Sequence, residues 1–122
     1  MKKILTLFFV FFTSEAIAVE KKTTFDLDIF KEAQNSGKTV VVSSWNKYCG
    51  TCTQQTKILD QAKKEFPNII FLSYEQKYKN IADYLKIDYW ATIAVYKNNK
   101  KIKQEIGITT KQDIYSLINQ GV

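Results

Sequence analysis

The segment TVVVSSWNKYCGTC, residues 39–52, joins two patterns that decide the fold. Its first half, from Thr39 to Trp45, is β-branched and apolar, which is typical of a buried central strand. Its second half ends in Cys49 and Cys52, the only two cysteines of the chain. A pair at this spacing is a structural disulfide, half of a metal site or a redox-active dithiol. The residues on either side indicate which of these it is.

The rest of the chain alternates between helical and strand-like patterns. Further strands are expected at residues 69–74, 92–97 and 101–106. Helices are expected at residues 25–35, 49–66, around 81–85 and after Thr109 and Thr110, which are good N-caps. Asn98-Asn99 is a hairpin-type turn signal. In the strand that follows it, Ile102 and Ile106 alternate with polar residues, which predicts an outer strand with one solvated face.

This order of elements predicts one α/β domain over residues 19–122. Parallel β-α-β crossovers come first and an antiparallel hairpin follows, so the central sheet is expected to be mixed. The chain has 122 residues, which is enough for one domain and too few for two ordinary ones. The polar stretch from Val19 to Thr24 is expected to be loose.

Composition excludes several classes of function. Hydrophobic residues make up 45% of the chain and charged residues 25%, as in an ordinary globular protein. There is no histidine, hence no Ser-His or Cys-His catalytic pair and no imidazole metal ligand. All 18 cationic residues are lysines, so bidentate arginine recognition of phosphate or guanine is absent. The lysines are scattered along the chain, and we therefore expect no nucleic-acid partner despite the net charge of +6.

The first 18 residues, MKKILTLFFVFFTSEAIA, have the three-part pattern of a secretory signal peptide. Lys2 and Lys3 form a positive start, an apolar run follows, and Ala16-Ile17-Ala18 supplies the small-x-small cleavage pattern. The apolar run is too short to span a bilayer comfortably, although a retained membrane anchor is the alternative. We expect cleavage after Ala18 and export to a bacterial periplasm, where disulfides persist.

From residue 24 to 122 the chain resembles the thioredoxin family. VVVSSWNKYCGTC is similar to the family's strand, tryptophan and C-G-x-C motif, and ILDQAKKEF to its long second helix. IDYWATIAVYKNNK is similar to the segment that carries the family's cis-proline and hairpin, and IGITTKQDIYSLI to its final helix. The resemblance implies a three-layer α/β/α sandwich with a central mixed β-sheet. Haem attachment is disfavoured because Thr53, and not a histidine, follows Cys52.

In this setting Cys49 is expected at the mouth of a helix and Cys52 one turn inside it. Unpaired amides and the partial positive charge of a helix N-terminus favour a thiolate, so Cys49 is the expected nucleophile and Cys52 the resolving thiol. A purely structural bridge would close a tiny loop and stabilise little. Zinc normally needs four ligands, and this chain has no further cysteine and no histidine to supply them, so no metal is expected within one chain.

The resemblance also assigns residues around the two sulfurs. The expected substrate-binding residues are Tyr48, Gly50, Trp90, Ala91 and Thr92. The expected supporting residues are Trp45 beneath the loop, Lys47 as a source of positive field, and Ser43. Core packing is an equal alternative for Trp45 and Trp90.

Three positions depart from the family pattern. Ala91 stands where the family has a cis-proline, and a cis peptide without proline costs about 2.5–4 kcal/mol. The Trp90–Ala91 peptide is therefore either trans in a reshaped loop or held cis under strain. Ser43 stands where many relatives bury an acid, so Cys52 would lose its proton to water or to another group such as Glu75, and slower resolution is expected. Gly50-Thr51 replaces Gly-Pro between the cysteines, which predicts an intermediate to reducing potential.

These patterns predict an exported thiol–disulfide oxidoreductase that exchanges disulfides with protein substrates. We expect a monomer that works with protein thiols and disulfides, depends on a membrane or periplasmic redox partner, and uses no cofactor beyond the Cys49–Cys52 disulfide. The direction of electron flow stays open. One alternative is a non-catalytic binding module with a locked disulfide. Another is a metal or iron–sulfur centre shared by two chains, each giving two thiolates.

Overall fold

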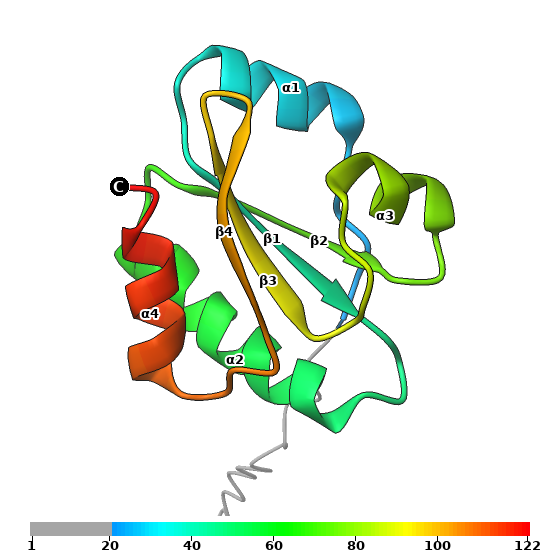
Figure 1. Ribbon diagram of the computed structural model, residues 1–122. Coiled ribbons are helices and arrows are strands. Elements are labelled where there is room, and N and C mark those ends of the chain that lie inside the picture. The colour runs from blue at the N-terminus through cyan, green and yellow to red at the C-terminus, as the bar shows by residue number, and fades with distance from the viewer. Residues whose placement is uncertain (1–20) are drawn as a thin grey trace, which may run out of the picture.

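The buried strand of the opening segment runs through the middle of a four-stranded sheet (Figure 1). The computed structural model describes residues 21–122. Its elements, in chain order, are α1 (Leu27–Asn35), β1 (Val40–Trp45), α2 (Gly50–Glu65), β2 (Ile70–Glu75), α3 (Lys79–Leu85), β3 (Thr92–Lys97), β4 (Lys100–Ile106) and α4 (Lys111–Asn119).

The predicted signal peptide, residues 1–18, lies outside the described residues. Within residues 21–122 no helix is both long enough and apolar enough to cross a membrane.

The strand order is β2-β1-β3-β4. β1 and β2 are parallel and joined through α2, whereas β3 is antiparallel to both β1 and β4. Val42 is paired with Leu72 on one side and with Ala94 on the other, which fixes β1 at the centre. The predicted mixed sheet and three-layer α/β/α fold are thereby confirmed.

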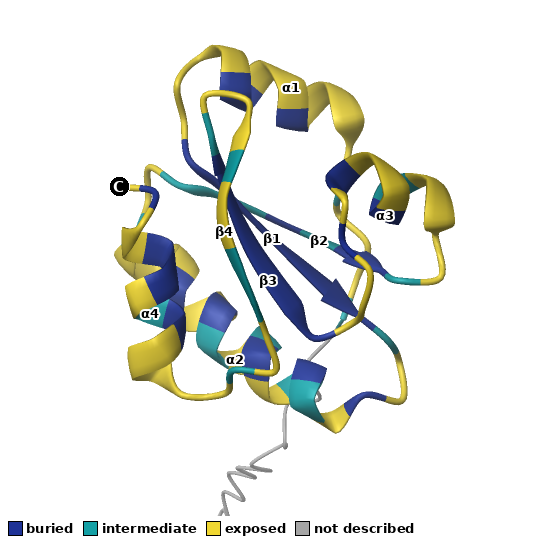
Figure 2. Ribbon diagram, in the orientation of Figure 1, coloured by how far each residue is buried: buried dark blue, intermediate teal, exposed yellow. Residues whose placement is uncertain are grey.

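Helices cover both faces of this sheet, with α1 and α3 on one side and α2 and α4 on the other (Figure 1). Successive side chains of a strand point to opposite faces, so the fully buried Val41 and Val42 enter different cores. Val42 joins Phe30 and Tyr74 beneath α1 and α3. Val41 joins the core beneath α2 and α4. Figure 2 shows β1 and β3 buried along their length, as a continuous apolar run predicts.

Side-chain caps and turns set the ends of the elements. The predicted first helix begins at Leu27 because the Asp26 carboxylate caps it and accepts hydrogen bonds from the N–H groups of Asp28 and Ile29. The hairpin turn matches its prediction, since Asn98 and Asn99 have φ angles of 54° and 65°. Positive φ at both central residues is the signature of a type I′ turn, which suits the twist of the paired strands.

β4 is the outer strand, as predicted, but its two isoleucines are exposed, so the expected burial of one face is wrong. Ile102 and Ile106, the apolar residues of β4, are 42% and 52% exposed. The pairing between β3 and β4 shifts at Val95/Tyr96, where Val95 opposes Lys103 and Tyr96 opposes Lys101. The shift leaves Ile102 without a partner, as in a β-bulge, and interrupts the two-residue period.

Within the polar stretch ahead of α1, residues 21–24 are docked, contrary to the expectation of a loose segment, whereas Val19 and Glu20 lie outside the described residues. We call residues 21–25 the N-terminal arm. It runs beside β2, where Thr24 and Phe25 donate N–H hydrogen bonds to Ser73 O at 2.8 and 2.9 Å. The hydroxyl of Thr23 accepts the N–H of Glu75 at 3.0 Å. These bonds cover part of an exposed sheet edge and bring the start of the arm towards the cysteines.

Candidate functional site: a disulfide at the start of α2

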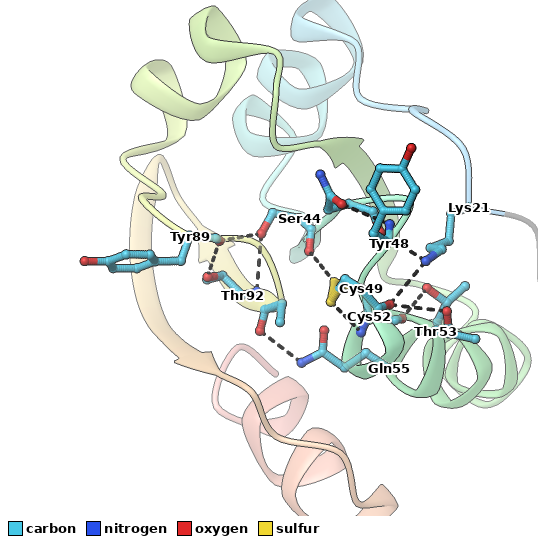
Figure 3. Close-up of a disulfide and its surroundings, with 12 residues drawn as sticks. Lys21, Ser44, Tyr48, Cys49, Cys52, Thr53, Gln55, Tyr89 and Thr92 are labelled. Carbon is cyan, nitrogen blue, oxygen red and sulfur yellow. Dashed lines mark hydrogen bonds between the residues drawn. A yellow bond between two sulfur atoms is a disulfide. The ribbon is translucent and has the colours of Figure 1, made fainter.

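Cys49 and Cys52 form a disulfide at the N-terminus of α2 (Figure 3). Cys49 is the N-cap residue, with extended backbone angles, and its Sγ accepts the N–H of Cys52 at 3.0 Å. Cys49 keeps 8% of its surface exposed and Cys52 keeps 1%. The sulfur that a substrate can reach is therefore the one that sits at the positive end of the helix.

The loop before Cys49 is shaped by Asn46. Its side-chain oxygen accepts the N–H of Tyr48 at 2.9 Å, and its carbonyl accepts the N–H of Cys49 at 3.0 Å. This turn leaves Tyr48 83% exposed beside the disulfide. The ammonium of Lys47 lies 5.2 Å from the centroid of the Tyr48 ring, in a cation–π arrangement.

Trp45 and Ala91 pack with the two cysteines in a small buried cluster. Trp45 is 8% exposed and donates its indole N–H to Lys22 O at 3.2 Å. Sγ of Cys52 lies 3.9 Å from Ser44 O. A disulfide sulfur carries no proton, so this is a plain contact in the oxidised protein that the Cys52 thiol can use as a donor once reduced.

The loop facing the disulfide is trans at every peptide bond, since residues 21–122 contain no cis peptide. Of the two expected alternatives, the reshaped trans loop is therefore the one found. Ala91 has a φ of 60°. Its N–H donates to Ser44 O at 2.9 Å, and its carbonyl accepts from Gly107 N at 2.8 Å and from Gln55 Nε2 at 3.0 Å.

Two residues that the sequence did not single out hold this loop. The hydroxyl of Ser44 donates to Tyr89 O at 2.8 Å and accepts the N–H of Thr92 at 3.2 Å. Gln55, 1% exposed on α2, donates to Ala91 O and Ile108 O, both at 3.0 Å. A glutamine among the core positions of α2, three residues after Cys52, was the signal that could have found it.

Thr92 is fully buried, and its hydroxyl donates to Tyr89 O at 2.7 Å. Its position gives it a role in shaping the loop, with no surface left for direct contact with a substrate.

A hollow of about 590 Å³ lies next to Cys49. Trp90 and Ala91 line it together with Thr51, and Ile106 and Gly107 border it from the hairpin side. Trp90 is 48% exposed. Among the residues that the structure describes, no hydrogen bond engages the backbone N–H or carbonyl of Trp90, so both groups are open. Gly50 is exposed, and a Cβ built there would meet no atom within 4 Å.

In the described part of the chain, no hydrogen bond joins Ser43 or Glu75 to Cys52. Ser43 lines a small cavity of about 100 Å³ between β1, α2 and the N-terminal arm, together with Trp45 and Thr56. The carboxylate of Glu75 lies 3.5 Å from the Lys77 ammonium. Serine supplies no acid at its position, and the buried Glu75 carboxylate is paired with Lys77.

Lys21 reaches the cysteine loop from the N-terminal arm. Its ammonium donates to Asn46 O at 3.1 Å and to Cys49 O at 3.2 Å (Figure 3). No local sequence pattern marks this contact, because it joins residues 28 positions apart through an arm without regular secondary structure.

Residues 21–122 contain no group of three or more cysteine or acidic side chains that could hold a metal ion. What the geometry does supply is a helix-capping sulfur, a buried second sulfur and an open backbone edge opposite them. These features define a protein of dithiol–disulfide exchange.

Comparison with known proteins agrees with this class. The Thioredoxin family model matches residues 16–120. Thioredoxin from Coprinus comatus is 29% identical over 85 residues, which cover 67% of this chain and 80% of that protein. Thioredoxin from Rickettsia felis is 27% identical over 100 residues, which cover 80% of this chain and 94% of that protein. The chain belongs to the thioredoxin family and is a thiol–disulfide oxidoreductase with a Cys-x-x-Cys disulfide.

Solved structures give the same fold. Trxlp from Edwardsiella tarda aligns with a TM-score of 0.72 at 18% identity, covering 77% of this chain and 94% of that one. Thioredoxin from Fasciola hepatica aligns with a TM-score of 0.68 at 18% identity, covering 79% and 93%.

Proposed function

We propose that this protein is exported to the periplasm and exchanges disulfides with protein substrates through Cys49 and Cys52. The observation that carries the proposal is the position of Cys49 Sγ, which caps α2, accepts the Cys52 N–H at 3.0 Å and borders the hollow beside Trp90. The helix N-terminus favours the thiolate of Cys49, and the thiolate is the species that attacks a disulfide.

In the reducing direction, the Cys49 thiolate attacks one sulfur of a substrate disulfide. The substrate S–S bond breaks, a mixed disulfide forms, and the leaving thiolate takes a proton from water. Cys52 then loses its proton and attacks Cys49 Sγ, which releases the second substrate thiol and closes the Cys49–Cys52 disulfide. Two electrons pass from the dithiol to the substrate, and the reverse sequence oxidises a substrate dithiol.

The substrate chain is proposed to lie along the hollow, extended beside Trp90. The open N–H and carbonyl of Trp90 can pair with it as with an added strand. The indole of Trp90 and the exposed ring of Tyr48 supply apolar surface on either side of Cys49, and Gly50 leaves room above the first turn of α2.

The second step, in which Cys52 attacks Cys49 Sγ and releases the substrate, is expected to be slow for this class of protein. No carboxylate is hydrogen-bonded to Cys52 in the described residues, so water is the proposed acceptor of the Cys52 proton. Ser43, which stands where many relatives bury an acid, cannot titrate and lines a small cavity.

Export and partners complete the proposal. The positive start, apolar run and Ala16-Ile17-Ala18 pattern support a cleaved signal peptide. In the periplasm the protein is proposed to act as a monomer without an added cofactor, and a membrane or periplasmic thiol protein is proposed to restore its redox state.

Trapping tests the exchange. A Cys52→Ser variant keeps the attacking sulfur and cannot resolve the mixed disulfide, so it is expected to accumulate proteins linked through Cys49 in periplasmic extracts. The measurement is non-reducing electrophoresis followed by mass spectrometry of the adducts. The wild-type protein is expected to reduce insulin disulfides, whereas Cys52→Ser is expected to lose about 10²-fold or more of the turnover that depends on resolution.

Cys49→Ser is the matched control and is expected to trap nothing. If Cys52→Ser yields no adducts and the wild-type protein fails to reduce insulin, the proposal is wrong. A binding module with a locked disulfide then becomes the better description.

A further inference from the structure

Lys21 touches the cysteine loop from the N-terminal arm through its side chain. Its ammonium bridges two carbonyl oxygens, those of Asn46 and Cys49, at 3.1 and 3.2 Å. Figure 3 shows the side chain of Lys21 directed at the start of α2, where Thr53 also donates to Cys49 O. The contact is partly buried and joins the first described residue to the N-cap of the catalytic helix.

We propose that Lys21 is a positioning residue that fixes the Cys49 loop and stabilises the Cys49 thiolate. The inference rests on the proposed role of Cys49 as the nucleophile. The carbonyl bound by Lys21 belongs to Cys49 itself, so the ammonium lies well within one Debye length of the sulfur, which is about 10 Å at 0.1 M salt. A cation this close favours the charged form of a thiol.

The arm is anchored well enough to hold that charge in place. Lys22 O accepts the indole N–H of Trp45 at 3.2 Å and the hydroxyl of Ser73 at 2.6 Å. The bonds of Thr23 and Thr24 to β2 follow immediately. The Lys21 backbone is therefore tied to the same strands that carry the site.

Other charged groups near Cys49 do not duplicate this role. The ammonium of Lys47 lies over the Tyr48 ring. Asp88 borders the hollow from the loop after α3, where its charge opposes the thiolate. At the end of β2, Glu75 is paired with Lys77. The first charged residue of α2 is Lys57, two turns beyond Cys49.

The test measures the pKa of Cys49 in a Cys52→Ser background, where iodoacetamide reacts with a single thiol. Lys21→Met removes the charge and the hydrogen bonds, Lys21→Gln removes the charge but keeps a donor, and Lys21→Arg keeps both. We expect Met and Gln to raise the Cys49 pKa by about half a unit to one unit and Arg to leave it close to the parent value. Alkylation below the pKa then slows about 3- to 10-fold in Met and Gln.

Lys57→Met, which removes an exposed charge from the same helix, is the matched control and is expected to alkylate like the parent. Thermal unfolding of each variant reports whether the arm stays docked. If Lys21→Met and Lys21→Gln both keep the parent pKa, the inference is overturned. If Gln keeps the parent pKa and only Met raises it, the charge has no part and the inference is also overturned.

The two proposals fail separately. A Cys52→Ser parent whose Cys49 ionises like a free thiol, near pH 8.5, would contradict the proposed function. A parent with a lowered pKa that is insensitive to Lys21 would contradict only the role of Lys21.

Discussion

At the scale of single residues, Ala91 shows how the loop opposite the cysteines keeps its shape without proline. A left-handed conformation costs an L-residue about 1–2 kcal/mol, and the φ of 60° at Ala91 lies in that region. Three hydrogen bonds offset the cost, one donated to Ser44 O and two accepted from Gly107 N and Gln55 Nε2. The conformation is imposed by its neighbours.

Introducing the family's proline at position 91 is therefore expected to lower both the stability and the activity of the protein. Ala91→Pro removes the N–H that Ser44 O accepts and forces φ towards −65°, so the free energy of unfolding is expected to fall by about 2–4 kcal/mol. Insulin reduction is expected to fall with it, because Trp90 moves with the loop. Urea unfolding and the insulin assay measure the two effects.

Ala91→Gly is the matched control for this change. It keeps the N–H and accepts a positive φ without strain, so stability is expected to stay within about 1 kcal/mol of the wild type. An Ala91→Pro protein as stable as the wild type would show that the loop can rebuild around proline.

The sequence identified both sulfurs and the departure at Ala91, because these depend on residue type at a fixed spacing. It did not identify Ser44 or Lys21. Their contacts with Tyr89 and Cys49 join residues that lie 45 and 28 positions apart. Polar contacts at such separations depend on the folded geometry, and no local pattern marks them.

At the scale of elements, α2 presents three functional side chains at three-residue spacing. Cys49 caps it, Cys52 is buried one turn on, and Gln55 follows on the same side of the helix. Gln55 links α2 to the Ala91 loop and to the residues ahead of α4 through Ile108 O. One helix therefore sets both the sulfurs and the surface opposite them.

Replacing Gln55 should disturb that surface without changing the sulfurs. Gln55→Leu leaves Ile108 O without this donor in a partly buried place, so we expect a loss of about 1–3 kcal/mol in stability. We expect a higher KM for a protein disulfide and an unchanged Cys49 pKa. Steady-state kinetics and alkylation profiles separate the two readouts.

Gln54→Leu changes the exposed neighbour on the same helix and is expected to have the kinetics of the wild type. Equal effects of Gln54→Leu and Gln55→Leu would show that the two hydrogen bonds of Gln55 are unimportant.

Secondary structure was predictable where periodicity is strong and unbroken, as in β1, β3 and α2. The strand β4 was predicted as well, but the exposure of its isoleucines was not, because Ile102 occupies the bulge and Ile106 borders the hollow beside Cys49. An extra residue in one strand reverses which side chains face the core, and the count of apolar positions does not reveal it. The exposed Ile106 belongs to the site and not to the core.

At the scale of the whole molecule, two buried tyrosines connect stability to pH. Burial raises the pKa of Tyr74 and of Tyr96 above the ordinary range. The Tyr74 hydroxyl donates to Gln76 Oε1 at 2.6 Å, and that of Tyr96 donates to Leu85 O at 2.9 Å. Both hydroxyls therefore stay protonated in the folded core while the unfolded chain titrates near pH 10.

Alkaline conditions are accordingly expected to unfold the protein. Because the folded pKa is higher than the unfolded one, stability is fully present below about pH 10 and is lost as the pH rises towards the folded value. Tyr96→Phe removes one such group, so stability should fall less steeply between about pH 9 and pH 12. Urea unfolding across this range provides the measurement.

Tyr89→Phe, which removes a hydroxyl from a side chain that is 64% exposed, is the control and should keep the slope of the wild type. A Tyr96→Phe slope equal to that of the wild type would mean that Tyr96 has no part in the alkaline transition.

The docked N-terminal arm has a practical consequence for the amino end of the protein. Cleavage after Ala18 would leave only Val19 and Glu20 ahead of Lys21, whose ammonium is hydrogen-bonded to the cysteine loop. A purification tag fused there could displace Lys21 from the cysteine loop, and a trimmed start at Phe25 would remove its contacts altogether. Either change would alter the redox centre. Val122 is 74% exposed at the opposite terminus, and a tag fused there is expected to leave the contacts of the cysteine loop unchanged.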